Sequence, residues 1–255
     1  MTDATELGGQ AILITGGAGG LGSAMAATLR RAGASVVIHD RQVERGKAVA
    51  RAVSADGPGT AVRFVAGDLA DLAATRAQVL ALDGELGGFA GLVNNAAVVP
   101  LKPIADYAID EYEAIQRVNA HAAFVLAQAL APGMARRGGG AIVNVCSITL
   151  GGEWTNFVPY VTSKGALLGM TRALARELGP AGIRVNAISP GAIPTDAEKV
   201  HPDPAGYARW VLERQSLKFR GTPADVAEAV LFLLSPRSRF VTGQTLDVNG
   251  GWLMS

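Results

Sequence analysis

The sequence predicts an α/β fold made of a single doubly wound parallel sheet, with about seven strands and helices on both faces. Along 255 residues, short runs rich in β-branched residues alternate with longer stretches rich in alanine and leucine. The short runs carry apolar residues on both faces, which indicates strands that are covered on both sides and therefore parallel. A glycine-rich segment separates the first run from the first helical stretch, where the chain must turn tightly.

Seven strands and six helices can be placed in order along the chain. The strands are predicted over residues 11–15, 35–39, 61–65, 91–94, 141–145, 183–188 and 245–248. The helices are predicted over residues 20–32, 43–54, 72–82, 106–137, 158–178 and 223–234. Gly33 follows the first helix as a C-cap, and Pro223 lies in the first turn of the last helix. Right-handed crossovers between these strands would give one doubly wound sheet.

Residues 1–255 are expected to form a single domain. A chain of this length can be one α/β domain, and no linker, internal repeat or low-complexity tract divides it. Residues from about 193 to 221 are the least regular, with Pro202 and Pro204 among them. We interpret this stretch as an insert that covers the substrate, with an ordinary surface loop as the alternative.

Composition narrows the class of protein and its setting. The 23 lysines and arginines nearly balance the 22 aspartates and glutamates, so we expect neither nucleic acid nor an anionic membrane as a partner. No stretch approaches about 18 uninterrupted apolar residues, which argues against a spanning helix. Cys146 is the only cysteine, and residues 1–10 lack the apolar run of a signal peptide, so we expect a cytoplasmic protein. His39 and His121 have no companions at metal-ligand spacing, and no metal is expected.

Residues 15–22, Thr-Gly-Gly-Ala-Gly-Gly-Leu-Gly, connect the first predicted strand to the first helix. They fit both the general dinucleotide fingerprint, Gly17-x-Gly19-x-x-Gly22, and the longer spacing Gly16-x-x-x-Gly20-x-Gly22. Glycines let a diphosphate approach the main-chain N–H groups, and the helix N-terminus adds partial positive charge. The segment therefore predicts a Rossmann-type dinucleotide site.

Asp40 ends the second predicted strand, 18 residues after Gly22. A carboxylate at about this spacing accepts hydrogen bonds from the hydroxyls of the adenosine ribose and repels a 2′-phosphate. We therefore expect NAD as the cofactor in preference to NADP. Two alternatives stay open: Arg41 could bind a 2′-phosphate if Asp40 swung away, and Asp40 could be a helix N-cap.

Tyr160 and Lys164 lie four residues apart near the start of a predicted helix, so their side chains share one face. A free tyrosine has a pKa of about 10, which is too high for a base at neutral pH. A nearby ammonium and a positively charged nicotinamide ring would each lower that pKa. Ser147 follows the fifth predicted strand, at the carboxyl end where doubly wound folds keep their sites. Its hydroxyl could hold the substrate oxygen.

Together these motifs resemble the short-chain dehydrogenase/reductase family over nearly the whole chain, from Gln10 to about Trp252. Residues 15–22 resemble its cofactor motif, and Asn94-Asn-Ala-Ala resembles its Asn-Asn-Ala-Gly segment, with alanine in place of the last glycine. Ser147 and Tyr160 stand at the family's offset of 13 residues. The catalytic tetrad that the resemblance implies is Asn119, Ser147, Tyr160 and Lys164.

The resemblance also implies roles for these residues. Asn119 would hold a water that connects Lys164 to solvent, and Lys164 would also bind the nicotinamide ribose. Asp68 with Leu69 resembles the pair that contacts adenine, and Asn94 would line the ribose site. Pro190-Gly191 with Thr195 resembles the segment that contacts the nicotinamide carboxamide. The cofactor-binding residues predicted in this way are Gly16, Gly20, Leu21, Gly22, Asp40, Asp68, Leu69, Asn94, Tyr160, Lys164, Pro190, Gly191, Ile193 and Thr195.

The resemblance further implies that the loop between Ser147 and Tyr160 borders the substrate. Glu153 and Asn156 offer hydrogen-bonding groups and Trp154 offers one flat apolar surface, which would suit a polyhydroxylated ring. The predicted substrate contacts are Ser147, Glu153, Asn156 and Tyr160. A solvated loop is the alternative for the residues between them.

We therefore expect an NAD(H)-dependent oxidoreductase that interconverts a secondary alcohol and a ketone, such as a sugar, cyclitol or polyol dehydrogenase. A 3-oxoacyl thioester reductase is one alternative, although a basic residue would be expected there in the glycine loop, near Gly19. A non-catalytic dinucleotide sensor on the same fold is another. Long apolar helices over residues 120–135 and 166–178 predict a homotetramer, as does the likeness of residues 243–251 to the family's assembly segment.

Overall fold

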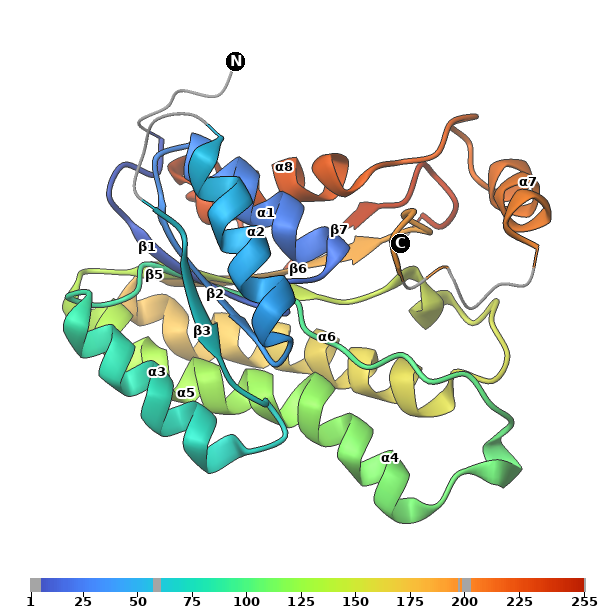
Figure 1. Ribbon diagram of the computed structural model, residues 1–255, viewed down its shortest axis with the longest axis horizontal. Helices are drawn as coiled ribbons and strands as arrows, with labels where there is room; N and C mark the ends of the chain where they lie inside the picture. Colours follow the sequence, from blue (N-terminus) through green and yellow to red (C-terminus); the bar gives the residue numbers. More distant parts are fainter. Residues whose placement is uncertain (1–5, 57–60, 197, 199–202, 255) are drawn as a thin grey trace.

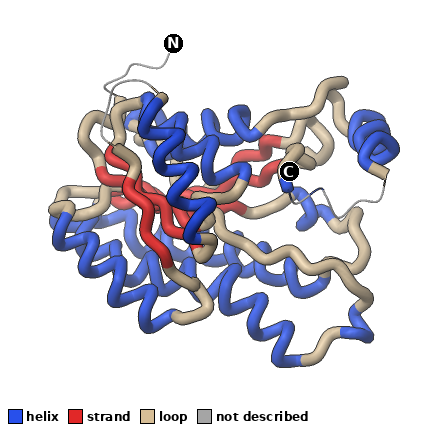
Figure 2. Tube along the Cα trace, viewed as in Figure 1, coloured by secondary structure: helices blue, strands red, loops and turns tan. Residues whose placement is uncertain are grey.

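The computed structural model describes residues 6–56, 61–196, 198 and 203–254. Its centre is a seven-stranded sheet in the order β3-β2-β1-β4-β5-β6-β7, and each neighbouring pair of strands is parallel (Figures 1 and 2). The strands are β1 (Ala11–Thr15), β2 (Ser35–Asp40), β3 (Arg63–Ala66), β4 (Gly91–Asn94), β5 (Gly140–Val145), β6 (Ile183–Pro190) and β7 (Thr245–Val248). The predicted fold class is confirmed, and the strand expected over residues 61–65 begins two residues later.

Helices form a layer on each face of the sheet (Figure 1). One face is covered by α1 (Gly20–Arg31), α2 (Val43–Ala55) and α8 (Pro223–Leu234), and the other by α3 (Leu72–Glu85), α5 (Ala122–Arg136) and α6 (Val158–Leu178). Leu29 of α1 packs with Val230 of α8 in one core, and Val79 of α3 packs with Leu126 of α5 in the other. Because both faces are covered, all five residues of β1 are buried, which explains its continuously apolar sequence.

The strand order locates the functional edge of the sheet. The chain runs outward from β1 to β3, then crosses back to place β4 on the other side of β1. The loops that follow β1 and β4 therefore leave the sheet in opposite directions, and a crevice forms between them at the carboxyl ends of the strands. Ligands of open α/β sheets bind in such a crevice.

The single helix expected over residues 106–137 is interrupted in the structure. A short 3₁₀ turn (Ile104–Asp106) precedes α4 (Ile109–Gln116), and a π-helical turn (Arg117–His121) joins α4 to α5. Asn119 lies in this turn. Its Oδ1 accepts a hydrogen bond from the Val98 N–H (2.8 Å), and its Nδ2 donates to the Val98 carbonyl (3.0 Å). A π-helical turn inserts an extra residue, and these contacts with the loop after β4 hold it in place.

The predicted insert of about 193–221 contains a helix, α7 (Pro204–Arg214), which stands apart from both helical layers and close to the C-terminus (Figure 1). The Asp203 carboxylate caps it by accepting a hydrogen bond from the Gly206 N–H at 2.9 Å. The chain after α7 pairs with the C-terminal segment, because the Leu217 N–H donates to the Gly250 carbonyl at 2.9 Å. The C-terminal segment therefore holds the insert in place.

Candidate active site

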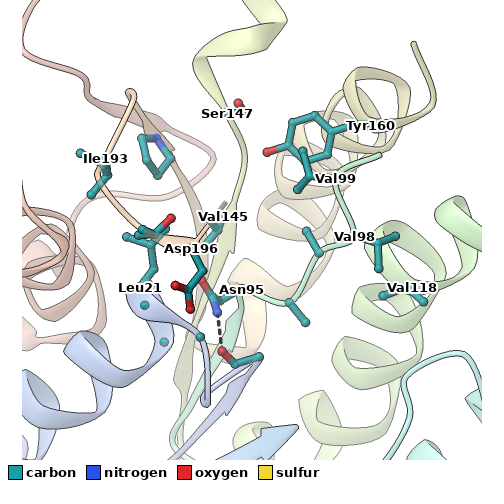
Figure 3. Close-up of a pocket in the computed structure, with 18 of the residues that line it drawn as sticks. Leu21, Asn95, Val98, Val99, Val118, Val145, Ser147, Tyr160, Ile193 and Asp196 are labelled. Carbon is teal, nitrogen blue, oxygen red and sulfur yellow. Dashed lines mark hydrogen bonds between the residues drawn. The ribbon is translucent and has the colours of Figure 1, made fainter. Parts of the chain in front are cut away.

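A cleft of about 460 Å³ opens at the carboxyl ends of the central strands (Figure 3). It is lined by the glycine loop, the ends of β2 and β3, the segment after β5, the start of α6 and the segment after β6. Most of the predicted site residues line this cleft: Gly16, Gly20, Leu21, Gly22, Asp40, Asp68, Leu69, Ser147, Tyr160, Lys164, Pro190, Gly191, Ile193 and Thr195. Asn94, Asn119, Glu153 and Asn156 lie outside that lining.

The glycine loop has the geometry that a dinucleotide requires. A Cβ on Gly22 would lie 2.3 Å from the Gly16 carbonyl oxygen, and a Cβ on Gly17 would lie 2.4 Å from Ile38 Cβ. Gly16 has a φ of 65°, in the left-handed region that favours glycine. Gly19 caps α1 without a side-chain hydrogen bond, so the free N–H groups of the helix N-terminus face the cleft as an anion site. A diphosphate fits this cradle.

Asp40 presents a fixed carboxylate at the end of β2. Its side chain is buried, with Oδ2 accepting from the Ala18 N–H (3.0 Å) and Oδ1 from the Gln42 N–H (2.9 Å). Ala18 belongs to the glycine loop, so this carboxylate and the loop hold each other in position. Arg41 also lines the cleft beside it. The arrangement keeps a negative charge next to the cradle, and the ribose role predicted for Asp40 stays a prediction.

Asn95, which the sequence did not single out, lines the cleft where Asn94 was expected. The Asn95 Nδ2 donates to the carbonyls of Thr15 (2.9 Å) and Gly16 (3.1 Å), and one dashed bond at Asn95 is drawn in Figure 3. Asn94 is the last residue of β4, and its Nδ2 instead donates to Asn144 Oδ1 inside the protein at 2.8 Å. The Asn94-Asn95 motif indicates that one asparagine faces the cofactor. Successive side chains at the end of a strand point in opposite directions, and the motif alone does not say which of the two faces the cleft.

Ser147 and Tyr160 both line the cleft, and the Tyr160 hydroxyl points into it (Figure 3). The Ser147 Oγ accepts hydrogen bonds from the Thr149 N–H (3.2 Å) and the Thr149 hydroxyl (3.0 Å). These bonds orient Ser147 and leave its own proton for Tyr160 or a substrate oxygen. Burial raises the pKa of Tyr160, and its hydrogen bond with Ser147 opposes this shift without cancelling it.

Lys164 lies one helical turn after Tyr160, with its Nζ 5.5 Å from the centroid of the tyrosine ring. The side chain is 1% exposed, and Nζ donates to the Val145 carbonyl at 2.6 Å. Burial lowers the pKa of Lys164 from 10.5 to about 8. A neighbouring ammonium was expected to lower the pKa of Tyr160. In the protein alone that pKa is raised instead, because desolvation is the largest effect at both Tyr160 and Lys164. The contribution of a bound nicotinamide ring stays a prediction.

Asn119 reaches α6 from the π-helical turn, because its Nδ2 donates to Ser163 Oγ at 3.1 Å as well as to the Val98 carbonyl. Both N–H bonds of its amide are thus used within the protein. The side chain fixes α6, and with it Tyr160 and Lys164, against the loop after β4. The water-holding role implied by the resemblance stays a prediction.

Glu153 and Asn156, predicted as substrate contacts, do not line the cleft. The Glu153 Oε2 accepts a hydrogen bond from the indole N–H of Trp252 at 2.7 Å. Asn156 is exposed, has a φ of 68° and accepts a hydrogen bond at its main-chain oxygen from the Lys102 N–H. Trp154 lines the cleft from the same loop. A contact with the C-terminal segment decides how this loop is turned, and spacing within the loop cannot predict that contact.

The described residues contain neither a metal-ligand cluster nor a membrane-spanning helix. No three histidine, cysteine, aspartate or glutamate side chains are gathered there as metal ligands would be. No described helix combines the length and the apolar character needed to cross a membrane. The cleft instead combines an anion cradle at a helix N-terminus with a paired tyrosine and lysine. That combination is typical of an α/β enzyme that binds a dinucleotide cofactor.

Comparisons with known proteins agree with this class. A family model described as enoyl-(acyl carrier protein) reductase matches residues 16–253. The chain is similar to D-xylose 1-dehydrogenase of Caulobacter vibrioides (37% identity over 247 residues, 97% of each chain) and to L-xylulose reductase of Mesocricetus auratus (38% over 250 residues, 98% of each). It is also similar to the solved structure of a gluconate 5-dehydrogenase from Burkholderia cenocepacia in complex with NADP and tartrate (TM-score 0.91, 33% identity, 98% of each chain).

The chain belongs to the short-chain dehydrogenase/reductase family. It is accordingly a dinucleotide-dependent oxidoreductase that interconverts a secondary alcohol and a carbonyl group.

Proposed function

We propose that this enzyme oxidises a secondary hydroxyl of a sugar or polyol and that NAD is its preferred cofactor. The observation that carries the proposal is the grouping of Ser147, Tyr160 and Lys164 on one wall of the cleft that the glycine loop also lines. The relatives named for D-xylose, L-xylulose and gluconate support a substrate of this class. Thioester reduction is the alternative, because the matching family model is described as an enoyl-(acyl carrier protein) reductase.

In the proposed reaction, Ser147 donates a hydrogen bond to the substrate oxygen and holds it beside the Tyr160 hydroxyl. Tyr160 takes the hydroxyl proton during oxidation and returns it during reduction. A nicotinamide ring bound in the cleft would supply the hydride chemistry, and its positive charge when oxidised would favour the Tyr160 phenolate. Lys164 holds its ammonium one turn away from Tyr160 and, as the resemblance implies, binds the nicotinamide ribose.

The preference for NAD rests on Asp40. Its buried carboxylate, held by two main-chain N–H groups, would accept hydrogen bonds from the ribose hydroxyls and repel a 2′-phosphate. The Burkholderia relative was solved with NADP, and Arg41 lies beside Asp40, so the preference needs a direct test. We expect NADH to bind at least about tenfold more tightly than NADPH in fluorescence titrations, a difference of roughly 1.4 kcal/mol. Equal affinities would contradict the NAD assignment.

A screen for NADH formation tests the substrate class. The panel contains pyranose sugars, open-chain polyols, hydroxysteroids and 3-hydroxyacyl thioesters, each assayed with wild type and Tyr160→Phe. We expect turnover of a sugar or polyol and a loss of about 10² to 10⁴ in kcat in the variant, which should still bind NADH. Turnover confined to thioesters would establish the alternative. NADH binding without any turnover would favour a sensor, and full activity of Tyr160→Phe would exclude the mechanism.

We further propose a homotetramer in a reducing, cytoplasmic setting. Phe124 on α5 and Val158 on α6 are about half exposed, at 51% and 44%, and Leu246 of β7 is 39% exposed. The family resemblance implies that subunits assemble through such helices and through the last strand, and these exposed apolar side chains lie on α5, α6 and β7. Light scattering at micromolar concentration should give four times the chain mass, and a monomer would contradict this proposal.

A further inference from the structure

Aromatic side chains from three separate segments pack together at one side of the cleft. All three tryptophans of the chain take part: Trp154 from the loop after β5, Trp210 from α7 and Trp252 near the C-terminus. The ring centroid of Trp154 lies 5.0 Å from that of Trp252 and 6.4 Å from that of Trp210. Trp210 and Trp252 are 4.9 Å apart. The three rings form one packed unit, which we call the tryptophan cluster.

Trp154 is the member of the tryptophan cluster that lines the cleft, and Tyr207 of α7 lines it as well. Trp252 packs against Trp154 from outside the lining and is 7% exposed. Tyr207 is stacked on Trp210, with centroids 5.6 Å apart and an interplanar angle of 22°. Aromatic surface backed by further aromatic rings therefore borders the same cleft as Ser147 and Tyr160.

Polar contacts hold the tryptophan cluster from behind. The Trp252 indole N–H donates to Glu153 Oε2 at 2.7 Å, and Arg214 Nε lies 4.0 Å from the same oxygen. The Arg214 guanidinium in turn lies 4.2 Å from the centroid of the Trp210 ring. Glu153 thus links the loop, the C-terminal segment and α7. These contacts restrain Trp154 through its neighbour Glu153 in the chain and through Trp252 in space.

Such a surface favours one form of polyhydroxylated substrate. A sugar in its ring form has a face of C–H groups and a rim of hydroxyls, so it can stack on an aromatic ring while its rim meets hydroxyl side chains. An open-chain polyol of the same carbon number has no comparable flat C–H face. Aromatic rings that line the same cleft as Ser147 and Tyr160 would therefore favour the ring form of a sugar over its open-chain polyol.

We propose that Trp154 is the platform on which the C–H face of a cyclic sugar stacks, and that Glu153 and Trp252 are positioning residues for this platform. The inference rests on the proposed function, because it assigns a substrate form to the same cleft. In this proposal Glu153 supports the aromatic surface and does not contact the sugar directly.

Kinetics of Trp154→Ala and Trp154→Phe test the platform. The probes are D-xylose and D-galactose as ring sugars, with xylitol and galactitol as open-chain partners of equal carbon number. We expect Trp154→Ala to raise KM for the better ring sugar about tenfold, with kcat within about threefold. Trp154→Phe, which keeps an aromatic face, should restore KM to within about threefold. The Kd for NADH should not change. Phe240→Ala, at a fully exposed aromatic, is the matched control.

Four results would overturn the platform. An unchanged KM for the ring sugar in Trp154→Ala excludes stacking, and an equal rise for the open-chain polyol excludes the distinction between ring and chain. A parallel loss of NADH affinity would show that Trp154 only supports the fold. If the substrate screen finds no sugar or polyol that wild type turns over, the proposed function fails instead. Tryptophan fluorescence of the NAD-bound enzyme, titrated with D-xylose, then measures stacking independently, and no quenching would overturn the platform as well.

The positioning role is tested by a pair of conservative variants. Glu153→Ala and Trp252→Phe each remove the hydrogen bond between the two side chains, and we expect KM to rise about two- to fivefold at constant kcat. Glu153→Gln keeps an acceptor oxygen and should restore KM. Because both changes remove the same bond, the double variant Glu153→Ala with Trp252→Phe should be no worse than either single variant. Additive effects, or no rescue by glutamine, would refute the positioning role.

Discussion

The two halves of the cleft are built by different means. The nucleotide half is built from main chain, because the glycine loop presents N–H groups and the Asp40 carboxylate is held by the main-chain N–H groups of Ala18 and Gln42. The substrate half is built from side chains, because its wall joins Trp154, Tyr207 and Trp252 from segments that are far apart in sequence. A site made of main chain depends on short local spacings, whereas a wall of side chains depends on how distant segments pack.

Lys164 gives the most severe test of this comparison, because its side chain lies between the halves and is held by the Val145 carbonyl. Its pKa falls from 10.5 in the unfolded chain to about 8 in the folded protein. Between these values the unfolded chain binds a proton that the folded protein does not, so the free energy of unfolding should rise with pH across this window. The full gain would be about 3 kcal/mol.

Urea unfolding from pH 7.5 to pH 11 measures this gain as the difference between wild-type Lys164 and Lys164→Met. Both are made in a Cys146→Ala background, because burial raises the pKa of Cys146 to about 11 from 9.0 and its titration lowers stability in an overlapping window. A difference that stays flat between pH 8 and pH 10.5 would show that Lys164 keeps its charge in the folded protein. Its ammonium would then be available to Tyr160 without a cofactor.

In the nucleotide half, Gly22→Ala should have the next largest effect. The added Cβ would lie 2.3 Å from the Gly16 carbonyl oxygen and 2.7 Å from Gly17 Cα, and main chain cannot move aside as a side chain can. Overpacking of about 1–3 kcal/mol should raise the Kd for NADH by roughly tenfold to a hundredfold, as measured by fluorescence titration. Gly19→Ala is the control, since its Cβ would meet the Gly16 oxygen at 3.3 Å and should change Kd by less than about threefold. Equal effects at both positions would mean that crowding does not decide the glycine pattern.

These glycines also show what the sequence predicts well. The loop, Asp40, Ser147, Tyr160 and Lys164 all lie at the ends of strands or one helical turn apart, so local spacing and the parallel sheet place them in one cleft. The alternation of apolar runs and helical stretches likewise predicted every strand of the sheet and its doubly wound form.

The errors have a common physical origin in contacts between distant segments. Glu153 is turned by a hydrogen bond to Trp252, which is 99 residues later in the chain. The helix expected over residues 106–137 is interrupted at Asn119, whose partners are Val98 and Ser163. Helix periodicity and loop composition contain no information about such partners, so these features emerge only when the elements pack.

Asp40→Asn separates the charge of the nucleotide half from its shape. The amide keeps an acceptor for one main-chain N–H but removes the negative charge beside the ribose. We expect the ratio of the NADPH Kd to the NADH Kd to fall about tenfold, the size of one charge-assisted hydrogen bond. Asp68→Asn is the control, because Asp68 also lines the cleft and its Oδ1 accepts from the Ala70 N–H in a similar way. If the Kd ratio changes only in Asp68→Asn, cofactor selectivity depends on Asp68, near the predicted adenine site, and not on Asp40.

The smallest effect is expected at an ion pair that links the two halves across the cleft. Arg45 Nη2 of α2 lies 2.6 Å from Asp196 Oδ2, after β6, and both residues line the cleft. Thr195, beside Asp196, packs on the glycine loop, since a Cβ on Gly20 would lie 3.0 Å from its Cγ2. The two side chains are 42% and 47% exposed, so solvent and salt screen the pair.

The charge-neutral double variant Arg45→Gln with Asp196→Asn should therefore release NADH only about two- to threefold faster than wild type in stopped-flow measurements at low salt. At about 0.5 M NaCl the two should release it equally, because the Debye length is then shorter than about 5 Å. The control is Arg63→Gln with Glu85→Gln, a pair with the same 2.6 Å separation that joins the start of β3 to the end of α3, away from the cleft. If the control variant changes the rate of NADH release by as much, the effect comes from the loss of surface charge in general and not from the ion pair at the cleft. If neither changes it, nucleotide release does not depend on a bond between the main-chain half and the side-chain half, and the two halves can be altered independently.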